Sequence, residues 1–208
     1  MDVHSSRHPD SATMLLSRPR FPVANIGFGI RAGMWLPGCR IFCRGCLAEN
    51  TWVFDESTRC GVAAILGWLQ ELPVDLIDGV TIYGREPTGR PAALRALLDG
   101  ISGWRARLAR PADILLYSGR SAAVLDDRFP WLRASVDALV TEHPVAEDGR
   151  DIALRGVANR EVVASSALGI RRYAAAEFGS DLISCDSCAR PRPIADTTAR
   201  TVGTGRSR

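Results

Sequence analysis

Apolar runs recur along the chain and are separated by polar turns, a pattern that predicts several short buried strands. Each run stops near a proline, serine or glycine, where the chain is expected to turn. The predicted strands are Ile30–Leu36, Gly79–Tyr83, Asp113–Tyr117 and Ser135–Val140, followed by two shorter ones at Ile152–Leu154 and Glu161–Val163. These runs are too short for helices and indicate strands that are covered on both faces.

Between the strands, apolar residues recur at helical spacing. Val62, Ile65, Leu66 and Leu69 form one such set, and a second set, spaced in the same way, follows Pro91. Strands that alternate with helices predict an α/β architecture, and 208 residues suffice for a single domain. We expect a flexible tail over residues 1–20, the domain over residues 21–188, and a disordered tail rich in arginine over residues 189–208.

Composition excludes several kinds of chemistry. All 26 basic residues are arginine, so a Schiff-base lysine and a P-loop lysine are both impossible. Of the three histidines, His4 and His8 lie in the N-terminal tail and only His143 lies in the body. A metal site made of three histidines is therefore excluded as well.

The net charge of +3 comes from the C-terminal tail. Residues 189–208 hold five arginines and one aspartate, so the rest of the chain carries about one negative charge. A solvated tail explains this positive charge better than nucleic-acid binding does. The longest nearly unbroken apolar stretch, residues 61–69, is far shorter than the roughly 20 residues that cross a bilayer. With no apolar signal segment at the N-terminus, the expected location is the cytoplasm, without membrane contact.

Three closely spaced cysteines carry the strongest chemical signal. Cys39, Cys43 and Cys46 form a C-x3-C-x2-C run just after the first predicted strand. A structural zinc ion prefers four protein ligands, and a cytoplasmic chain disfavours disulfides. A [4Fe-4S] cluster fits three thiolates better, because it leaves the fourth iron open to a substrate.

The remaining cysteines leave an alternative open. A zinc site could be completed by Cys60, or by Cys185 together with Cys188. Cys60 precedes a predicted helix, where a packed free thiol is the simpler interpretation. Cys185 and Cys188 fit half of an interchain zinc site, a redox pair or two unpaired thiols.

The sequence around the cysteines resembles radical S-adenosylmethionine (SAM) enzymes, and in particular the activases of anaerobic ribonucleotide reductase. The likeness covers roughly residues 21–163. Its motifs are Trp35-Leu36-Pro37-Gly38, the cysteine loop through Arg44-Gly45-Cys46, Glu49-Asn50-Thr51-Trp52, Gly84-Arg85-Glu86-Pro87, Leu116-Tyr117-Ser118-Gly119 and Arg155-Gly156-Val157-Ala158-Asn159-Arg160.

This resemblance implies a function, a fold and a set of cofactors. It implies an open, partial β/α barrel that holds a [4Fe-4S] cluster on Cys39, Cys43 and Cys46, and SAM near Gly84, Glu86 and Ser118. The implied reaction cleaves SAM reductively to a 5′-deoxyadenosyl radical, which generates a glycyl radical on a partner enzyme. The implied partners are an anaerobic ribonucleotide reductase and a reduced flavodoxin- or ferredoxin-type electron donor.

One departure from the family keeps other functions open. Arg85 stands where the family usually has the second glycine of Gly-Gly-Glu-Pro, at a loop that meets the amino group of SAM. Two alternatives therefore remain. One is a radical SAM enzyme that modifies a peptide or small molecule, and the other is a non-catalytic iron–sulfur protein that binds or transfers electrons.

Overall fold

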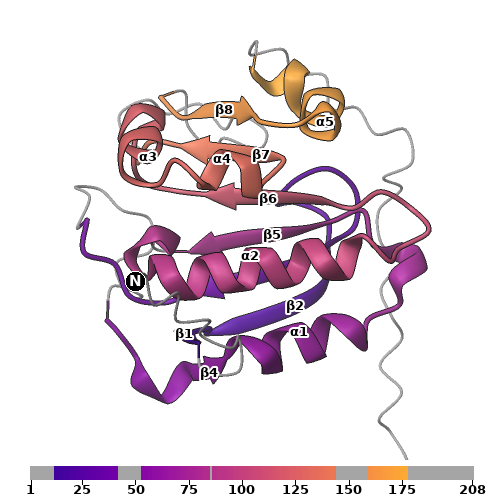
Figure 1. The fold of residues 1–208 in the computed structure, drawn as a ribbon, viewed down its shortest axis with the longest axis horizontal. Coiled ribbons are helices and arrows are strands. Elements are labelled where there is room, and N and C mark those ends of the chain that lie inside the picture. Colours follow the sequence, from indigo (N-terminus) through magenta and orange to yellow (C-terminus); the bar gives the residue numbers. More distant parts are fainter. Residues whose placement is uncertain (1–11, 42–52, 85, 144–158, 178–208) are drawn as a thin grey trace, which may run out of the picture.

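A six-stranded sheet forms the centre of the molecule (Figure 1). The computed structural model describes residues 12–41, 53–84, 86–143 and 159–177. In their order across the sheet, the strands are β2 (Arg18–Val23), β3 (Arg31–Leu36), β5 (Gly79–Gly84), β6 (Asp113–Tyr117), β7 (Ala138–Thr141) and β8 (Glu161–Ala164). A separate pair of short strands joins β1 (Thr13–Leu15) to β4 (Arg59–Gly61).

The sheet is mixed. Strands β3, β5, β6 and β7 run parallel, while β2 and β8 pair antiparallel at the two edges. The edge strands do not pair with each other, so the described part of the sheet is open. The α/β class predicted from the sequence is therefore confirmed, and the parallel centre brings the carboxyl ends of β3, β5 and β6 to one edge.

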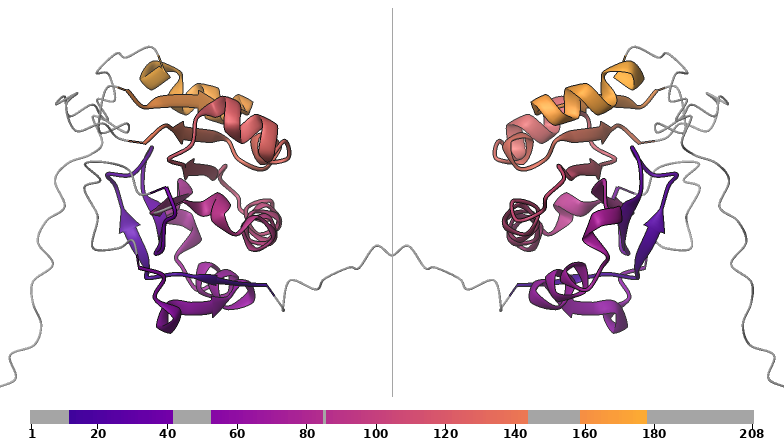
Figure 2. Two further views of the ribbon diagram at one scale, coloured as in Figure 1. Left: turned by 90° about the vertical axis from the view of Figure 1, so that its left-hand side faces the viewer. Right: turned by 90° about the vertical axis from the view of Figure 1, so that its right-hand side faces the viewer.

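Four helices cover one face of the sheet, as the side views in Figure 2 show. They are α1 (Val62–Gln70), α2 (Pro91–Arg105), α3 (Ala122–Arg128) and α4 (Leu132–Ser135). A fifth helix, α5 (Ala167–Glu177), packs against β8 and β7. Within the described ranges, short 3-10 helices lie at Glu56–Thr58, Val74–Leu76 and Pro87–Gly89.

Both faces of the central strands are buried. Met34, Ile82 and Leu116 point toward the helices and pack in the main core, whereas Leu115 and Val140 lie in a second cluster on the opposite face. All five side chains are fully buried. Coverage on both faces explains why the strands read as continuous apolar runs in the sequence.

A buried ionic network closes the edge where the parallel strands begin. Arg31 and Asp113 are both fully buried, and their side chains form a two-pronged pair at 3.0 and 2.7 Å. The Tyr173 hydroxyl donates to Asp113 Oδ2 at 2.7 Å, and Arg172 binds the other carboxylate oxygen. Helix α5 is thereby attached to the first residue of β6.

The predicted elements agree with the structure over most of the centre and differ at two places. β3, β5, β6 and the two helices α1 and α2 lie where the sequence predicts them. The predicted strand Ser135–Val140 is wrong in its first half, because Ser135 ends helix α4, its hydroxyl donating to the Trp131 carbonyl at 3.0 Å. Strand β7 begins only at Ala138.

The predicted N-terminal tail extends too far. Residues 13–15 and 18–20 belong to strands β1 and β2, and Met14 and Leu15 are almost fully buried. Burial of these two side chains anchors a segment that lies within the predicted tail. Residues 1–11, the predicted strand at 152–154 and the C-terminal tail at 189–208 lie outside the described residues.

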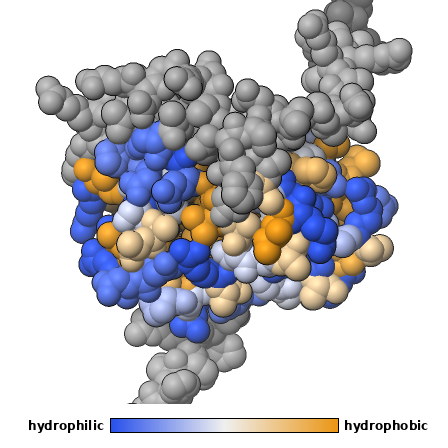
Figure 3. Space-filling model, turned by 90° about the horizontal axis from the view of Figure 1, so that it is seen from above, coloured by the Kyte–Doolittle hydropathy of each residue, from blue (hydrophilic) through white to orange (hydrophobic). Residues whose placement is uncertain are grey.

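Large apolar side chains that are exposed come from several segments of the described residues. No helix among these residues is both long and apolar enough to span a bilayer. The end of the sheet that carries β8 and α5 intersperses hydrophilic and hydrophobic side chains (Figure 3). Large exposed apolar side chains such as Val53, Leu76 and Ile170 come from separate segments of the chain.

Candidate functional site

The candidate site lies at the edge where β3, β5 and β6 end. The chain leaves β3 at Leu36 and enters the cysteine loop through Pro37-Gly38, while β5 ends at Gly84 and β6 at Tyr117. Leu36 and Gly84 are register partners, so the cysteine loop starts directly beside the end of β5. The carboxyl edge of a parallel sheet is the usual place for ligand sites in α/β proteins.

Of the three cysteines predicted to hold a cluster, Cys39 is the one that lies within the described residues. Its side chain is buried, and its Sγ accepts the backbone N–H of Ile41 at 3.4 Å. Gly38 precedes it with φ +83°, and a Cβ at this position would collide with the Phe54 ring. Glycine is therefore needed for the chain to turn toward Cys39. Cys43 and Cys46 lie outside the described residues, and their predicted roles stay predictions.

Gly84 is required by space as well as by backbone conformation. Its φ is +125°, a region that glycine alone adopts readily. A Cβ at this position would lie 2.5 Å from the Leu36 carbonyl oxygen and 2.6 Å from the Leu36 nitrogen. Both are backbone atoms of the adjacent strand, so they cannot move without disturbing the β3–β5 pairing.

We expect Gly84→Ala to lower the free energy of unfolding by about 2–4 kcal/mol, because it adds backbone strain to steric overlap. Chemical denaturation followed by circular dichroism measures the change. Gly89→Ala is the matched control, since a Cβ at position 89 meets nothing within 4 Å. Equal stability of the two variants would contradict this account of the β5 terminus.

Glu86 joins the ends of β5 and β6. Its carboxylate accepts the Thr88 hydroxyl at 2.6 Å and the Thr88 backbone N–H at 3.1 Å. From the β6 end it accepts the Ser118 hydroxyl at 2.9 Å and the Gly119 backbone N–H at 3.0 Å. The residue is 7% exposed. Four donors therefore fix this carboxylate, and two of the predicted SAM contacts, Glu86 and Ser118, touch each other directly.

Arg120 adds a positive charge beside the Glu86 carboxylate and its hydrogen-bond partners. Its Nε lies 3.9 Å from Glu86 Oε1 and donates to the Thr88 hydroxyl at 3.0 Å. Its backbone N–H donates to the Ser118 hydroxyl at 3.1 Å. Neither Thr88 nor Arg120 is among the site residues predicted from the sequence. Thr88 had a local signal, since a glutamate two residues before it can cap the short helix that begins at Pro87.

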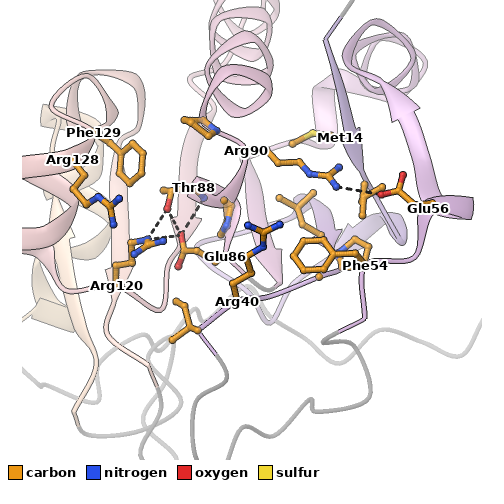
Figure 4. A pocket seen from close by; sticks show the side chains of 18 residues that line it. Met14, Arg40, Phe54, Glu56, Glu86, Thr88, Arg90, Arg120, Arg128 and Phe129 are labelled. Carbon is orange, nitrogen blue, oxygen red and sulfur yellow. Dashed lines mark hydrogen bonds and ion pairs between the residues drawn. The ribbon is translucent and has the colours of Figure 1, made fainter.

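A pocket of about 850 Å³ opens beside this group (Figure 4). Gly38 and Arg40, the two neighbours of Cys39, line it together with Glu86. Cys39 and Glu86, predicted from separate motifs, therefore belong to one region. Arg90 and Arg128 also line the pocket. No motif distinguishes either of them from the other arginines of the chain.

Cys60 lies in a different part of the structure from Cys39, in the separate pair of short strands. It lies in β4, opposite Met14 of β1, and packs against the main core. Burial raises the pKa of its thiol, which disfavours the thiolate that a metal would bind. Among the described residues, no group of three histidine, cysteine or acidic side chains is arranged to hold a metal. Cys185 and Cys188 lie outside these residues.

Comparisons with known proteins agree with the geometry of this edge. The family described as "4Fe-4S single cluster domain" matches residues 26–163, which is more than half of the chain. The anaerobic ribonucleoside-triphosphate reductase-activating protein of Vibrio cholerae serotype O1 is 29% identical over 148 residues, covering 65% of this chain and 88% of that protein. These findings confirm the resemblance to the activases. The chain belongs to the family of 4Fe-4S single cluster domains.

Proposed function

We propose that this chain is a radical SAM activase that generates a glycyl radical on a partner enzyme. The observation that supports it most is that Cys39 and the Glu86–Ser118 pair, from motifs far apart in the sequence, lie at one sheet edge. The similar Vibrio cholerae protein activates an anaerobic ribonucleoside-triphosphate reductase. We therefore propose a reductase of that kind as the partner, with a reduced flavodoxin or ferredoxin as electron donor.

The described residues fit an iron–sulfur cluster at Cys39. Its side chain is buried at the start of the loop, and the Ile41 N–H donates to Sγ, the kind of contact that amide groups make to the sulfurs of a bound cluster. Cys39, Cys43 and Cys46 would hold three irons and leave the fourth for SAM. When bound and reduced, the cluster supplies one electron that splits SAM into methionine and a 5′-deoxyadenosyl radical.

On this proposal, one hydrogen atom would pass from the target glycine Cα of the partner to the 5′-deoxyadenosyl group, which would give 5′-deoxyadenosine and a glycyl radical. The protein's task is to place the reacting atoms and exclude water. We propose that Gly84, Glu86 and Ser118 form the wall against which the methionyl end of SAM is held, within an open β/α barrel of the radical SAM type.

Glu86 shapes this wall by holding its neighbours in place. All four donors to its carboxylate come from Thr88, Ser118 and Gly119, at the ends of both strands. We expect Glu86→Ala to lower the free energy of unfolding by about 2–4 kcal/mol, since buried donors lose their acceptor. Cleavage of SAM by the reconstituted variant should fall at least about tenfold.

The variant Glu86→Gln separates the effect on stability from the effect on SAM cleavage. It keeps one acceptor oxygen but places an amide NH₂ against donors, so it should lose less stability than alanine. Denaturation curves and chromatographic assay of 5′-deoxyadenosine on both variants provide the comparison. An alanine variant with the stability and SAM cleavage of the parent chain would exclude this role for Glu86.

The partner assignment is tested by electron paramagnetic resonance. The reduced protein is mixed with SAM and the anaerobic ribonucleoside-triphosphate reductase from the same genome. We expect a glycyl radical signal that requires SAM, reductant and both proteins. Formation of 5′-deoxyadenosine without any radical on the reductase would show that the partner is a different molecule.

A further inference from the structure

Glu86 and Arg90 lie at the two ends of one short turn. Glu86 caps the start of the 3-10 helix Pro87–Gly89, and Arg90 follows its last residue and precedes helix α2. The backbone is fixed at both ends, because the Glu86 carbonyl accepts the Gly89 N–H at 2.9 Å and the Arg90 carbonyl accepts the Leu94 N–H at 3.0 Å. Both side chains line the large pocket at the carboxyl edge of the sheet. The turn therefore brings an acidic and a basic group to the same pocket.

The described lining of this pocket carries more positive than negative charge. Its arginines are Arg40, Arg90, Arg120 and Arg128, and its carboxylates are Glu56 and Glu86. Glu86 lies 3.9 Å from Arg120, so this carboxylate already has a cation beside it. Glu56 is shared between Arg90 and Arg59, which lies outside the pocket. The arginines that remain favour an anionic group on the ligand.

One donor atom of Arg90 is buried without an acceptor. Nη1 has no hydrogen-bond partner among the described residues, and Nη2 lies 3.6 Å from Glu56 Oε1, which is longer than a hydrogen bond. A buried N–H without an acceptor is costly, so a ligand oxygen at Nη1 would be stabilising. The side chain as a whole is 30% exposed, which leaves its guanidinium free to turn toward a ligand.

The Phe54 ring connects Arg90 to the start of the cysteine loop. The guanidinium carbon of Arg90 lies 5.9 Å from the centroid of this ring. The same ring packs against Gly38, the residue before Cys39, where a Cβ would collide with it. Figure 4 shows Arg90 on the Phe54 side of the pocket and Arg128 on the opposite side, near Phe129. Arg90 is therefore on the same side of the pocket as the start of the cysteine loop.

We propose that Arg90 binds the carboxylate of SAM and selects for ligands that carry it. This assignment rests on the proposed function, which brings SAM to this pocket. The methionyl end of SAM carries an ammonium and a carboxylate on one carbon, and the family resemblance assigns the ammonium to the loop after β5. Arg90, at the far end of the same turn, supplies a planar set of N–H donors that matches a carboxylate. A ligand without the carboxylate leaves Nη1 unpaired, so it should bind more weakly.

Equilibrium dialysis with the reconstituted but unreduced protein tests this role, because SAM is not consumed without a reductant. The two probes are SAM and decarboxylated SAM, which keeps the ammonium and the sulfonium. The parent chain should prefer SAM. The variant Arg90→Gln should bind SAM at least about tenfold more weakly, with a change of less than about twofold for decarboxylated SAM. Arg90→Lys should retain part of the preference, because it keeps the charge but not the planar donor set.

Arg128→Gln is the charge-matched control within the same pocket. Arg128 is exposed and has no carboxylate within pairing distance among the described residues. Its replacement removes one positive charge from the lining, as Arg90→Gln does. The ratio of the two affinities should stay within about twofold of that of the parent chain, because the exposed guanidinium of Arg128 is already solvated. The open iron would also favour a carboxylate, so the comparison between variants isolates the part that Arg90 supplies.

Three results would overturn the role of Arg90: equal binding of the two probes by the parent chain, an Arg90→Gln variant that keeps the preference of the parent for SAM, or an equal loss of preference in Arg128→Gln. Each of them leaves SAM as a ligand and the proposed function intact. A parent chain with a full cluster that binds neither probe would instead contradict the proposed function itself. The two failures are therefore distinguished in one set of measurements.

Discussion

Cys39→Ala should abolish the iron–sulfur cluster, and with it all cleavage of SAM. The reconstituted parent chain should contain about four irons and four sulfides, held by Cys39, Cys43 and Cys46. Two cysteines alone rarely retain such a cluster, and this variant removes one of the three thiols, the buried one that follows β3. Iron and sulfide assays, with the visible absorbance of the cluster, measure the loss.

Cys60→Ala is the matched control for this experiment. Cys60 packs against the core from β4, and burial raises the pKa of its thiol, so its removal should leave the iron content unchanged. Loss of the cluster in this variant would instead show that the cluster depends on Cys60. A full cluster in the Cys39→Ala variant, or stoichiometric zinc in the parent chain purified without oxygen, would contradict the assignment.

The second large effect concerns stability rather than chemistry. Asp113→Ala should lower the free energy of unfolding by about 3–5 kcal/mol, because it leaves the fully buried Arg31 without its counter-ion. Arg172 and Tyr173 lose the same partner, so the attachment of α5 to β6 weakens as well. Urea denaturation should show this loss, and α5 should become more accessible to protease.

Asp126→Ala provides the exposed counterpart. Asp126 also pairs with an arginine, Arg133, but on the surface, where water already solvates both charges. Its replacement should change stability little. If the two alanine variants were equally stable, the buried pair would not hold the sheet edge as the structure indicates.

The buried pair of Arg31 and Asp113 also predicts how the stability of the fold depends on pH. Burial by itself would raise the pKa of Asp113, but the charge and hydrogen bonds of Arg31, with those of Tyr173 and Arg172, lower it overall. A carboxyl group with a lowered pKa in the folded state stabilises the fold above its unfolded pKa of about 3.9. The parent chain should therefore lose stability as the pH falls below about 4, and the Asp113→Ala variant should lose less.

Hydrophobic pattern predicted the centre of the fold because each central strand satisfies a local rule. β5 and β6 each contain a run of buried, mostly apolar residues and end next to turn residues, so consecutive positions in the sequence indicate their burial. β2 was missed because Pro19 and Pro22 interrupt it, and a strand tolerates proline only at an edge. Its position at the edge depends on pairing with β3, which no local pattern reveals.

The site was predictable only where chemistry is encoded in short motifs. The spacing of Cys39 from the other two cysteines suggested a cluster, and family motifs suggested Glu86 and Ser118. Their direct hydrogen bond could not be read from the sequence, because 32 residues separate them. The same limit applies to Arg31 and Asp113, which are 82 residues apart and become partners only when β3 and β6 are placed in one sheet.

The most direct measurement of the central claim is the release of 5′-deoxyadenosine by the anaerobically reconstituted, dithionite-reduced protein given SAM. The account predicts 5′-deoxyadenosine and methionine in equal amounts, formed slowly without a partner protein, and none without reductant. A reduced protein with a full cluster that neither binds SAM nor forms 5′-deoxyadenosine would contradict the account. It would identify the chain as an iron–sulfur protein that binds or transfers electrons without cleaving SAM.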